Sequence, residues 1–226
     1  MAEKALIVGA GPNLSASLAR LFAREGMAVS LAARSTDKLA GLARETGATV
    51  HACDSTRAAD VAKLFEAAGA PDVVVYNASG RVRGAVTDIA PDAVEQAIRT
   101  SCFGGFLVAR EAALRMIPRG SGTILFTGAS ASVKGFANSS AFAMGKFGLR
   151  GLAQSLAREL HPKNIHVAHV VIDGGIARPG DASRGDRGPD GFLDPDEIAK
   201  TYLQLHRQQR SAWAWEIELR PWVEKF

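Results

Sequence analysis

The chain has 226 residues, a length that suggests one large domain. Apolar residues make up 47% and charged residues 22%, as in ordinary globular proteins, and two cysteines are too few for a disulfide framework. The net charge of +4 comes from scattered basic residues, so we expect a solvated surface and no nucleic-acid partner. No stretch approaches the roughly 20 apolar residues of a membrane span, and we expect a cytoplasmic protein with no membrane partner.

Short apolar runs alternate with longer amphipathic patterns along the chain. The runs predict strands at 5–9, 27–33, 48–52, 72–77, 122–127 and 165–172. Apolar spacing of three and four residues predicts helices at 15–26, 36–47, 57–69, 92–116 and 139–160. Near-continuous Val, Ile and Leu strands between helices indicate an α/β fold, a Rossmann-like doubly wound parallel sheet in a single domain over residues 1–226.

The pattern is interrupted after the sixth strand by the segment 174–192, which is rich in glycine, proline and charge. A long loop at the carboxyl end of a sheet strand usually covers a ligand, so we expect a flexible substrate loop, although a disordered insertion has the same composition. Asp194 and Pro195 then begin a helix that extends to about residue 208. Alternating apolar residues in 211–222 predict a last strand at the sheet edge.

The turn GAGPNLS at residues 9–15 joins the first strand to the first helix. Helix N-termini present free N–H groups and a positive dipole, which suit a pyrophosphate. We expect Gly9 to allow the tight turn and Gly11 to allow close approach of a ligand to the backbone. Asn13 would tolerate left-handed geometry, and Leu14 completes the candidate cofactor-binding turn. The turn therefore predicts a dinucleotide site.

The second predicted strand ends at Arg34, followed by Ser35 and Thr36. An acidic residue at this place would bind the ribose 2′-hydroxyl of NAD, whereas an arginine beside hydroxyls matches a 2′-phosphate. The sequence thus favours NADP(H) over NAD(H) as cofactor. The alternative is a surface arginine that opens a loop.

With these features the chain resembles the short-chain dehydrogenase/reductase family over nearly its full length. The resemblance rests on the glycine-rich turn, on Asp54 after the third strand, on Asn77 and Ala78 after the fourth, and on a lysine in the fifth helix. It implies that Asp54 meets the adenine edge and that the residues around Asn77 line the adenosine. After the sixth strand Gly174 keeps the family's glycine, whereas Arg178 stands where the family has a threonine that holds the nicotinamide amide.

The departures from the family pattern fall among the catalytic residues. The family uses an asparagine in the fourth helix, a serine after the fifth strand, and a tyrosine and a lysine four residues apart. The corresponding positions here hold Ser101, Ala129, Phe142 and Lys146. The usual proton donor is absent, and a general acid is worth roughly 10²–10⁴-fold in rate.

Three hydroxyl-bearing residues are candidates to replace the missing acid, either directly or through a water. These are Ser130, Ser140 and Tyr76. Lys146 would orient the nicotinamide ribose, as the resemblance implies. We therefore expect an atypical NADP(H)-dependent oxidoreductase acting on a small carbonyl compound or alcohol. The alternative is a catalytically degenerate dinucleotide-binding protein that acts as a sensor or an oligomeric scaffold.

The resemblance also implies a homodimer or homotetramer formed by the fourth and fifth helices. Small residues such as Gly104 and Gly105 would permit close helix packing there. No metal site is expected. His166 and His169 lie three residues apart in a predicted strand, so their side chains point to opposite faces and cannot share an ion.

Overall fold

The computed structural model describes residues 2–178, 185 and 187–224. Seven strands form one parallel sheet in the order β3-β2-β1-β4-β5-β6-β7. The strands are β1 (Lys4–Val8), β2 (Ala28–Ala33), β3 (Thr49–Ala52), β4 (Val73–Tyr76), β5 (Gly122–Thr127), β6 (Ile165–Ile172) and β7 (Glu216–Leu219). All seven predicted strands are confirmed, and β7 lies at the sheet edge as expected. The strand order reverses between β1 and β4, which is where ligands bind in such sheets.

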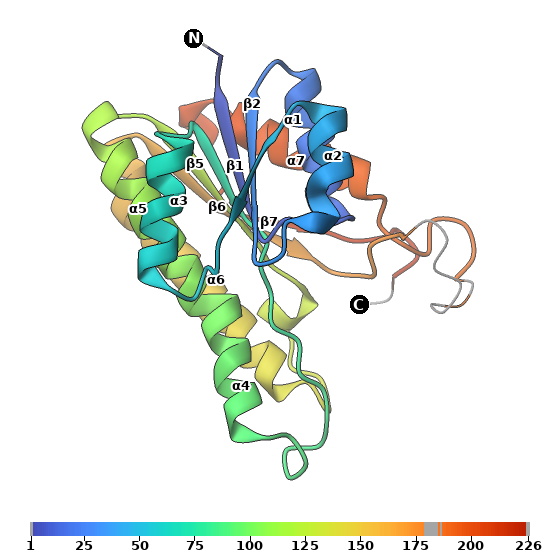
Figure 1. Ribbon diagram of the computed structural model, residues 1–226. Helices are drawn as coiled ribbons and strands as arrows, with labels where there is room; N and C mark the ends of the chain where they lie inside the picture. The colour runs from blue at the N-terminus through green and yellow to red at the C-terminus, as the bar shows by residue number, and fades with distance from the viewer. Residues whose placement is uncertain (1, 179–184, 186, 225–226) are drawn as a thin grey trace.

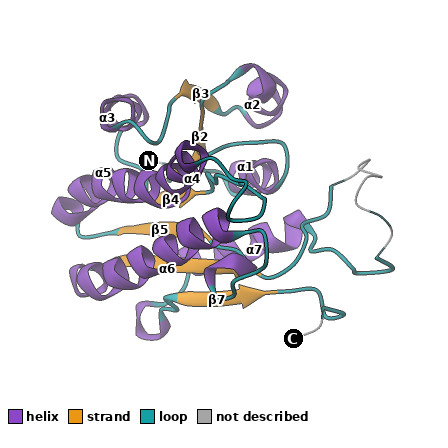
Figure 2. Cartoon of the chain, turned by 90° about the horizontal axis from the view of Figure 1, so that it is seen from below, coloured by secondary structure: helices purple, strands orange, loops and turns teal. Residues whose placement is uncertain are grey.

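Helices cover both faces of the sheet, as Figure 2 shows from the edge where the strands end. One face carries α1 (Leu14–Arg24), α2 (Ala40–Thr46) and α7 (Pro195–His206). The other carries α3 (Ala58–Ala68), α5 (Gly104–Arg119) and α6 (Ser140–Leu160). The predicted Rossmann-like single domain is confirmed. Short 3₁₀ turns precede α2 (Asp37–Leu39) and α6 (Ser130–Ser132), follow α6 (His161–Lys163), and precede β7 (Arg210–Ala212).

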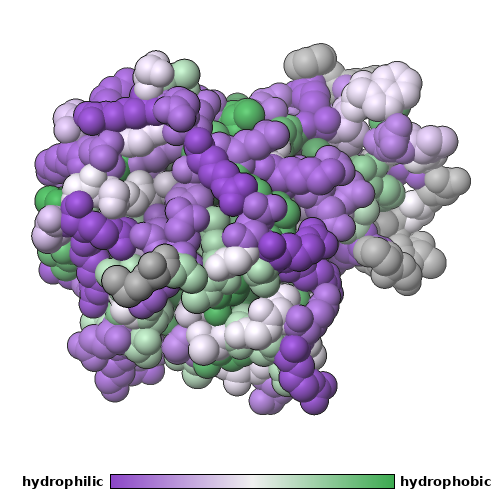
Figure 3. Space-filling view, turned by 90° about the horizontal axis from the view of Figure 1, so that it is seen from above, coloured by the Kyte–Doolittle hydropathy of each residue, from purple (hydrophilic) through white to green (hydrophobic). Residues whose placement is uncertain are grey.

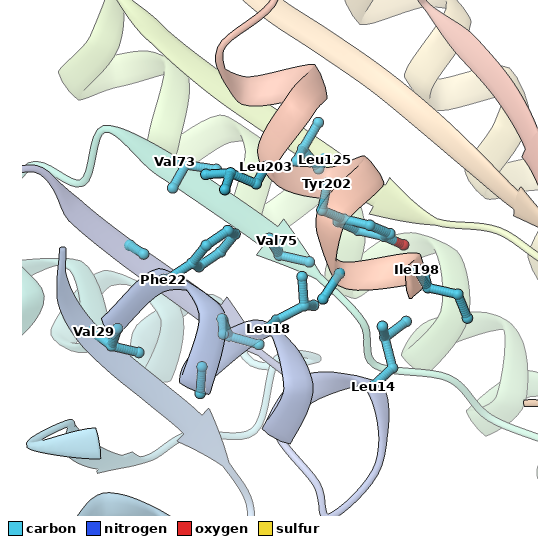
Figure 4. Close-up of a cluster of buried hydrophobic side chains, with 14 of the residues drawn as sticks. Leu14, Leu18, Phe22, Val29, Val73, Val75, Leu125, Ile198, Tyr202 and Leu203 are labelled. Atoms are coloured by element: carbon cyan, nitrogen blue, oxygen red, sulfur yellow. The ribbon is translucent and has the colours of Figure 1, made fainter. Parts of the chain in front are cut away.

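The core beneath α1 and α7 sets the position of the strands' carboxyl ends. Leu18 and Phe22 of α1 meet Ile198 and Tyr202 of α7 over the buried β4 side chain of Val75 (Figure 4). Each such buried apolar side chain contributes about 1.5–3 kcal/mol. The buried hydroxyl of Tyr202 has a hydrogen-bond partner in this core, because it lies 2.8 Å from the Thr127 hydroxyl at the end of β5.

The predicted single helix over 92–116 is divided in the structure. α4 (Pro91–Ile98) leads into a π-helical turn (Arg99–Phe103) and then into α5. In Figure 1 α4 extends beyond the ends of the strands, beside the first turns of α6. The widened turn places Ser101, fully buried, against Gly145 of α6, where a side-chain carbon added to that glycine would lie 2.7 Å from the serine. π turns of this kind often occur at functional sites.

Gly104 and Gly105 do not face outward, contrary to the packing role expected for them. A side-chain carbon at Gly104 would lie 2.4 Å from the Tyr76 hydroxyl, and one at Gly105 would lie 2.7 Å from Leu149. These glycines let α5 approach β4 and α6 within the subunit. The exposed apolar side chains of this face are instead larger, and they include Phe106, Leu114, Met144 and Phe147.

The two ends of the segment 174–192 are held together. Ala177 donates a backbone hydrogen bond to Leu193 (2.7 Å), and Leu193 donates one to Gly175 (2.8 Å). We predicted a flexible loop over 174–192. Residues 179–184 and 186 of that loop lie outside the described residues.

The opposite end of the molecule, where the strands begin, has a mostly hydrophilic surface (Figure 3). Within the described ranges, no helix combines the length and the apolar character needed to cross a bilayer.

Candidate functional site

The carboxyl ends of the first four strands surround a cavity of about 390 Å³, here called the adenosine cavity. It collects residues from four separate loops that the sequence assigned to the cofactor. These residues are Gly9, Arg34, Ser35, Asp54, Asn77 and Ala78. Residues up to 69 positions apart, from Gly9 to Ala78, therefore converge where the strand order reverses, as the fold requires.

Gly9 is essential to the shape of this cavity. Its φ of +83° is in the left-handed region, and an added side-chain carbon would lie 2.3 Å from the backbone nitrogen of Ala78. At Gly11 the same carbon would meet nothing within 4 Å, so the backbone there is open to a ligand. The expectation for Asn13 is wrong in its geometry, because its φ is −109° rather than left-handed.

Ser15 stands where the family has the third glycine of this turn, and its hydroxyl joins two elements. The Asn77 side-chain amide donates to the Ser15 hydroxyl at 2.7 Å, and that hydroxyl donates to the carbonyl oxygen of Gly9 at 3.3 Å. The backbone N–H of Asn77 also donates to Val8 at 2.8 Å. The substitution thus ties the turn to the end of β4 by hydrogen bonds.

The rim of the adenosine cavity contains one acidic and one basic side chain. Asp54 accepts hydrogen bonds from the backbone N–H and the hydroxyl of Thr56, at 2.9 and 2.8 Å. These bonds and the nearby Arg34 lower the pKa of Asp54, so the carboxylate stays charged. Arg34 itself is exposed, at a place where it can meet a phosphate that enters the cavity.

A second cavity of about 270 Å³, here called the lysine cavity, adjoins the first and shares Asn77 and Ser79 with it. Predicted residues that line it are Asn13, Leu14, Asn77, Ala129, Lys146 and Gly174. Lys146 is buried, and its ammonium donates a hydrogen bond to the backbone oxygen of Thr127 at 2.7 Å. Burial, with a smaller effect of the nearby Arg81 cation, lowers the pKa of Lys146 to about 7.

Arg81 packs over the ring of Phe142, with its guanidinium carbon 4.8 Å from the ring centroid. The loop that carries it is held by Ser101, whose hydroxyl accepts from the N–H of Gly80 at 3.0 Å. Gly80 also lies so close to Ala97 that an added side-chain carbon would be 2.6 Å away from the Ala97 Cα. Two of the changed catalytic positions, 101 and 142, therefore support one arginine beside Lys146.

The three hydroxyl candidates for the missing acid do not line the lysine cavity. Tyr76 is fully buried beneath α5, and its hydroxyl donates to the backbone oxygen of Thr100. Burial raises the pKa of Tyr76, so this hydroxyl is poorly suited to release a proton, and the expectation that it donates one is wrong. Ser130 hydrogen-bonds the carboxylate of Asp173, and Ser140 forms the first turn of α6.

Asp173 belongs to a separate ionic group next to the site. Its carboxylate accepts from Lys134 at 3.0 Å and from Arg220. Ser130 and these two cations lower its pKa against the opposing effect of burial. The expected placement of Ser130 near the reacting atoms is therefore not what the structure shows.

Sequence reasoning missed Arg81 and Ser79, both of which line the lysine cavity, and gave no role to Thr127. The signal for the first two was their place directly after Asn77, in the loop that follows a central strand. Contact between Arg81 and Phe142, 61 positions apart, has no local signal.

Among the described residues, no group of three His, Cys, Asp or Glu side chains could hold a metal ion.

These features fit a dinucleotide that spans both cavities. The backbone is open at Gly11, and the adjoining α1 N-terminus has neither a side-chain cap nor an acidic residue in its first turn. Such a terminus favours a phosphate group. The fold and the paired cavities together define a nucleotide-binding protein of the Rossmann type.

The family model for short chain dehydrogenases matches residues 3–181. The chain belongs to this family, as the glycine turn and the lysine in α6 indicated. The match confirms the predicted family and supports an enzyme.

Three similar proteins illustrate the range of the relatives. A short-chain dehydrogenase from Rhodopseudomonas palustris has a crystal structure with 35% identity and a TM-score of 0.85, covering 97% of this chain and 99% of that chain. A metagenomic short-chain oxidoreductase in complex with NADP has 28% identity and a TM-score of 0.84, with 98% of each chain covered. The cyclic-di-GMP-binding biofilm dispersal mediator protein of Escherichia coli (strain K12) is 29% identical over 181 residues, 80% of this chain and 76% of that protein.

Proposed function

We propose that this protein is an NADP(H)-dependent oxidoreductase that interconverts a small carbonyl compound and its alcohol. The observation that carries the proposal is the pair of adjoining cavities, one bordered by Arg34 and the other containing the buried Lys146. The metagenomic relative in complex with NADP supports the same choice of cofactor. Arg34 and Ser35 would bind the 2′-phosphate, and Lys146 would contact the nicotinamide ribose.

We assign the proton transfer to the ammonium of Lys146 in place of the missing tyrosine. NADPH would supply a hydride to the carbonyl carbon, so a group of this chain must supply a proton to the oxygen. Lys146 lines the cavity, and a pKa of about 7 allows it to be protonated and still release its proton at neutral pH. The neutral amine would then take a proton back from solvent. Thr127 holds the nitrogen in place throughout.

Calorimetric titration with NADPH and NADH tests the choice of cofactor. We expect NADPH to bind more tightly, because a charge-assisted contact to the 2′-phosphate adds roughly 1.5–3 kcal/mol. Tighter binding of NADH would contradict the role of Arg34, and binding of neither at millimolar concentration would overturn the proposed cofactor. Single-turnover oxidation of NADPH against a panel of aldehydes and ketones, recorded from pH 5 to 9, then tests the reaction. The rate should fall as Lys146 loses its proton with an apparent pKa near 7.

A second candidate function is ligand sensing without turnover. It is favoured by the missing tyrosine and serine and by the Escherichia coli relative, which is described as binding cyclic di-GMP. Calorimetry with cyclic di-GMP separates the candidates. Binding of cyclic di-GMP without NADPH oxidation on any carbonyl compound would favour the sensor, whereas NADPH turnover would favour the enzyme.

We also propose a homodimer or homotetramer formed through α5 and α6, in the cytoplasm. The exposed apolar side chains Phe106 and Leu114 on α5 and Met144 and Phe147 on α6 support this assembly. Sedimentation velocity should give a species of at least twice the monomer mass, and Phe106→Glu with Phe147→Glu should shift it to the monomer. A wild-type monomer at micromolar concentration would contradict the assembly.

A further inference from the structure

Lys146 is a buried lysine with no acidic partner among the described residues. It is only 2% exposed, yet it lines the lysine cavity. Its one hydrogen bond within the described part of the chain goes from the side-chain nitrogen to the backbone oxygen of Thr127 at 2.7 Å. A buried cation without an anion is costly, so such a lysine gives up its proton more readily than an exposed one. Burial accordingly lowers the pKa of Lys146 to about 7.

An acidic side chain on the same face of the sheet, Glu216 of β7, is held by other groups. Its carboxylate accepts from Arg150 at 2.6 and 2.7 Å and lies 3.0 Å from Nδ1 of His169. His169 is fully buried, and burial lowers its pKa to about 4, so this imidazole is neutral at pH 7. The charged group that acts on the pKa of Lys146 is Arg81, which lowers that pKa further after the larger effect of burial. None of these groups supplies the negative charge that would fix Lys146 as an ammonium.

We infer that Lys146 is a nucleophile that forms an imine with small aldehydes and ketones that enter the lysine cavity. The neutral amine uses one N–H for Thr127, and its lone pair accepts no hydrogen bond from the described residues. Lysines that are desolvated, or that lie near another cation, are the ones that act as nucleophiles in proteins. The inference goes beyond the proposed hydride transfer, and it requires no nicotinamide cofactor.

The covalent step needs neither an oxidant nor a reductant. The nitrogen lone pair of Lys146 attacks the carbonyl carbon, and the π electrons of the C=O bond move to the oxygen as the C–N bond forms. One N–H proton passes to that oxygen, which gives a carbinolamine. The C–O bond then breaks, the second N–H proton leaves with the oxygen as water, and a C=N bond remains.

Two features of the fold prepare Lys146 for this step. The preceding residue, Gly145, packs so tightly on the π turn that an added side-chain carbon would lie 2.7 Å from Ser101. The α6 backbone that carries the lysine is therefore fixed, as its nitrogen is by Thr127. Phe142, one turn earlier on the same helix, has no hydroxyl that could exchange a proton with the amine. The phenylalanine at the family's tyrosine position thus leaves no competing acid beside the amine.

Reductive trapping of the cofactor-free protein tests the inference. Propanal and benzaldehyde are the probes, and cyanoborohydride reduces an imine to a stable secondary amine. Peptide mass mapping then locates each adduct, which adds to a lysine the mass of the aldehyde less one oxygen atom. At pH 7.5 we expect Lys146 to be labelled about 10- to 100-fold faster than the exposed Lys63 of α3, because only about one exposed lysine in 10³ is neutral at that pH.

The pH dependence and two matched substitutions separate this chemistry from simple accessibility. The ratio of Lys146 to Lys63 labelling should fall about tenfold or more from pH 7 to 9, because Lys63 gains neutral amine over that range while Lys146 is already largely neutral. Lys146→Arg should remove the fast label, whereas Lys63→Arg should retain it. A fast label that survives in Lys146→Arg would overturn the inference. Equal labelling of Lys146 and Lys63 in wild type would also overturn it, and that comparison requires no variant to fold.

The failure of this inference can be told from the failure of the proposed function. If Lys146 contacts the nicotinamide ribose, saturating NADP⁺ should slow its labelling about tenfold or more, because the contact occupies the amine. Fast labelling that NADP⁺ does not slow would retain the nucleophile and overturn the ribose contact. Oxidation of NADPH by a protein whose Lys146 is labelled no faster than Lys63 would overturn the nucleophile and leave the oxidoreductase.

Discussion

The ammonium of Lys146 donates a hydrogen bond to the backbone oxygen of Thr127, 2.7 Å away at the end of β5. The hydroxyl of the same threonine lies 2.8 Å from that of Tyr202, which approaches from the opposite face of the sheet. One residue of a central strand thus connects a helix on each face. Lys146 is thereby held in its cavity without the tyrosine that the family has at position 142.

The buried Lys146 should make the stability of the protein depend on pH. Its pKa in the folded state is about 7, below the ordinary value of 10.5, so the unfolded chain binds more protons between these two values. The free energy of unfolding should therefore rise with pH from 7 upward, by about 2 kcal/mol between pH 7 and 9. Urea unfolding of wild type and of Lys146→Met at pH 7 and at pH 9 measures this rise in the free energy of unfolding.

The difference in pH dependence between wild type and Lys146→Met separates the contribution of this lysine from the contributions of other titrating groups. Lys146→Met should remove the rise, whereas Lys63→Met, at an exposed position of α3, should retain it. Equal pH dependence in wild type and Lys146→Met would show that the ammonium is solvated in the folded protein.

The two glycines of the first turn should respond differently to alanine. Gly9→Ala should lower the free energy of unfolding by roughly 2–4 kcal/mol, from the left-handed φ and from overlap with Ala78. Gly11→Ala should change it by less than about 0.5 kcal/mol, because its side chain would meet open space. Gly11→Ala should nevertheless weaken NADPH binding, since the methyl group occupies the ligand's approach. Unchanged NADPH affinity in a folded Gly11→Ala protein would place the pyrophosphate elsewhere.

Arg34 should discriminate between the two nicotinamide cofactors. Arg34→Ala is expected to raise the Kd for NADPH roughly 10- to 100-fold while leaving that for NADH nearly unchanged, because only NADPH has the 2′-phosphate. Lys38→Ala, an exposed cation outside both cavities, serves as the control for general electrostatic attraction. Equal losses for NADPH and NADH, measured by fluorescence titration, would exclude selection by Arg34.

Restoring the family's two missing hydroxyls tests how the reaction is run. In Ala129→Ser with Phe142→Tyr, a tyrosine would again stand four residues before Lys146. Turnover should rise by about 10²-fold, because a tyrosine acid and a serine hydrogen-bond donor would be added to the ammonium of Lys146. The rate constant for NADPH oxidation at saturating substrate measures this. A decrease would mean that Phe142 and Arg81 have been adapted to another arrangement of the substrate.

The sequence alone was sufficient for the strands, for most of the helices and for the adenosine cavity, but not for the division of the predicted helix over 92–116 by a π turn. Period-2 and period-3.6 apolar patterns are local properties, and in a parallel sheet the carboxyl ends of the strands meet at one edge. Residues directly after strands, such as Gly9 and Arg34, could therefore be assigned together before any contact was seen, and the family resemblance added Asp54. It was the resemblance to the family, and not these patterns, that indicated that Phe142 and Ala129 occupy the tyrosine and serine positions.

The tertiary structure decided which groups remain for the chemistry. Serine and tyrosine hydroxyls look alike in sequence, but burial under α5 directs Tyr76 to the backbone of Thr100 and away from the cavity. The stacking of Arg81 on Phe142 depends on a loop held by the π turn at Ser101, and no local pattern encodes such contacts. Apolar periodicity determines the fold because it is summed over many residues, whereas the direction of one polar side chain depends on a few long-range contacts that only the folded chain brings together.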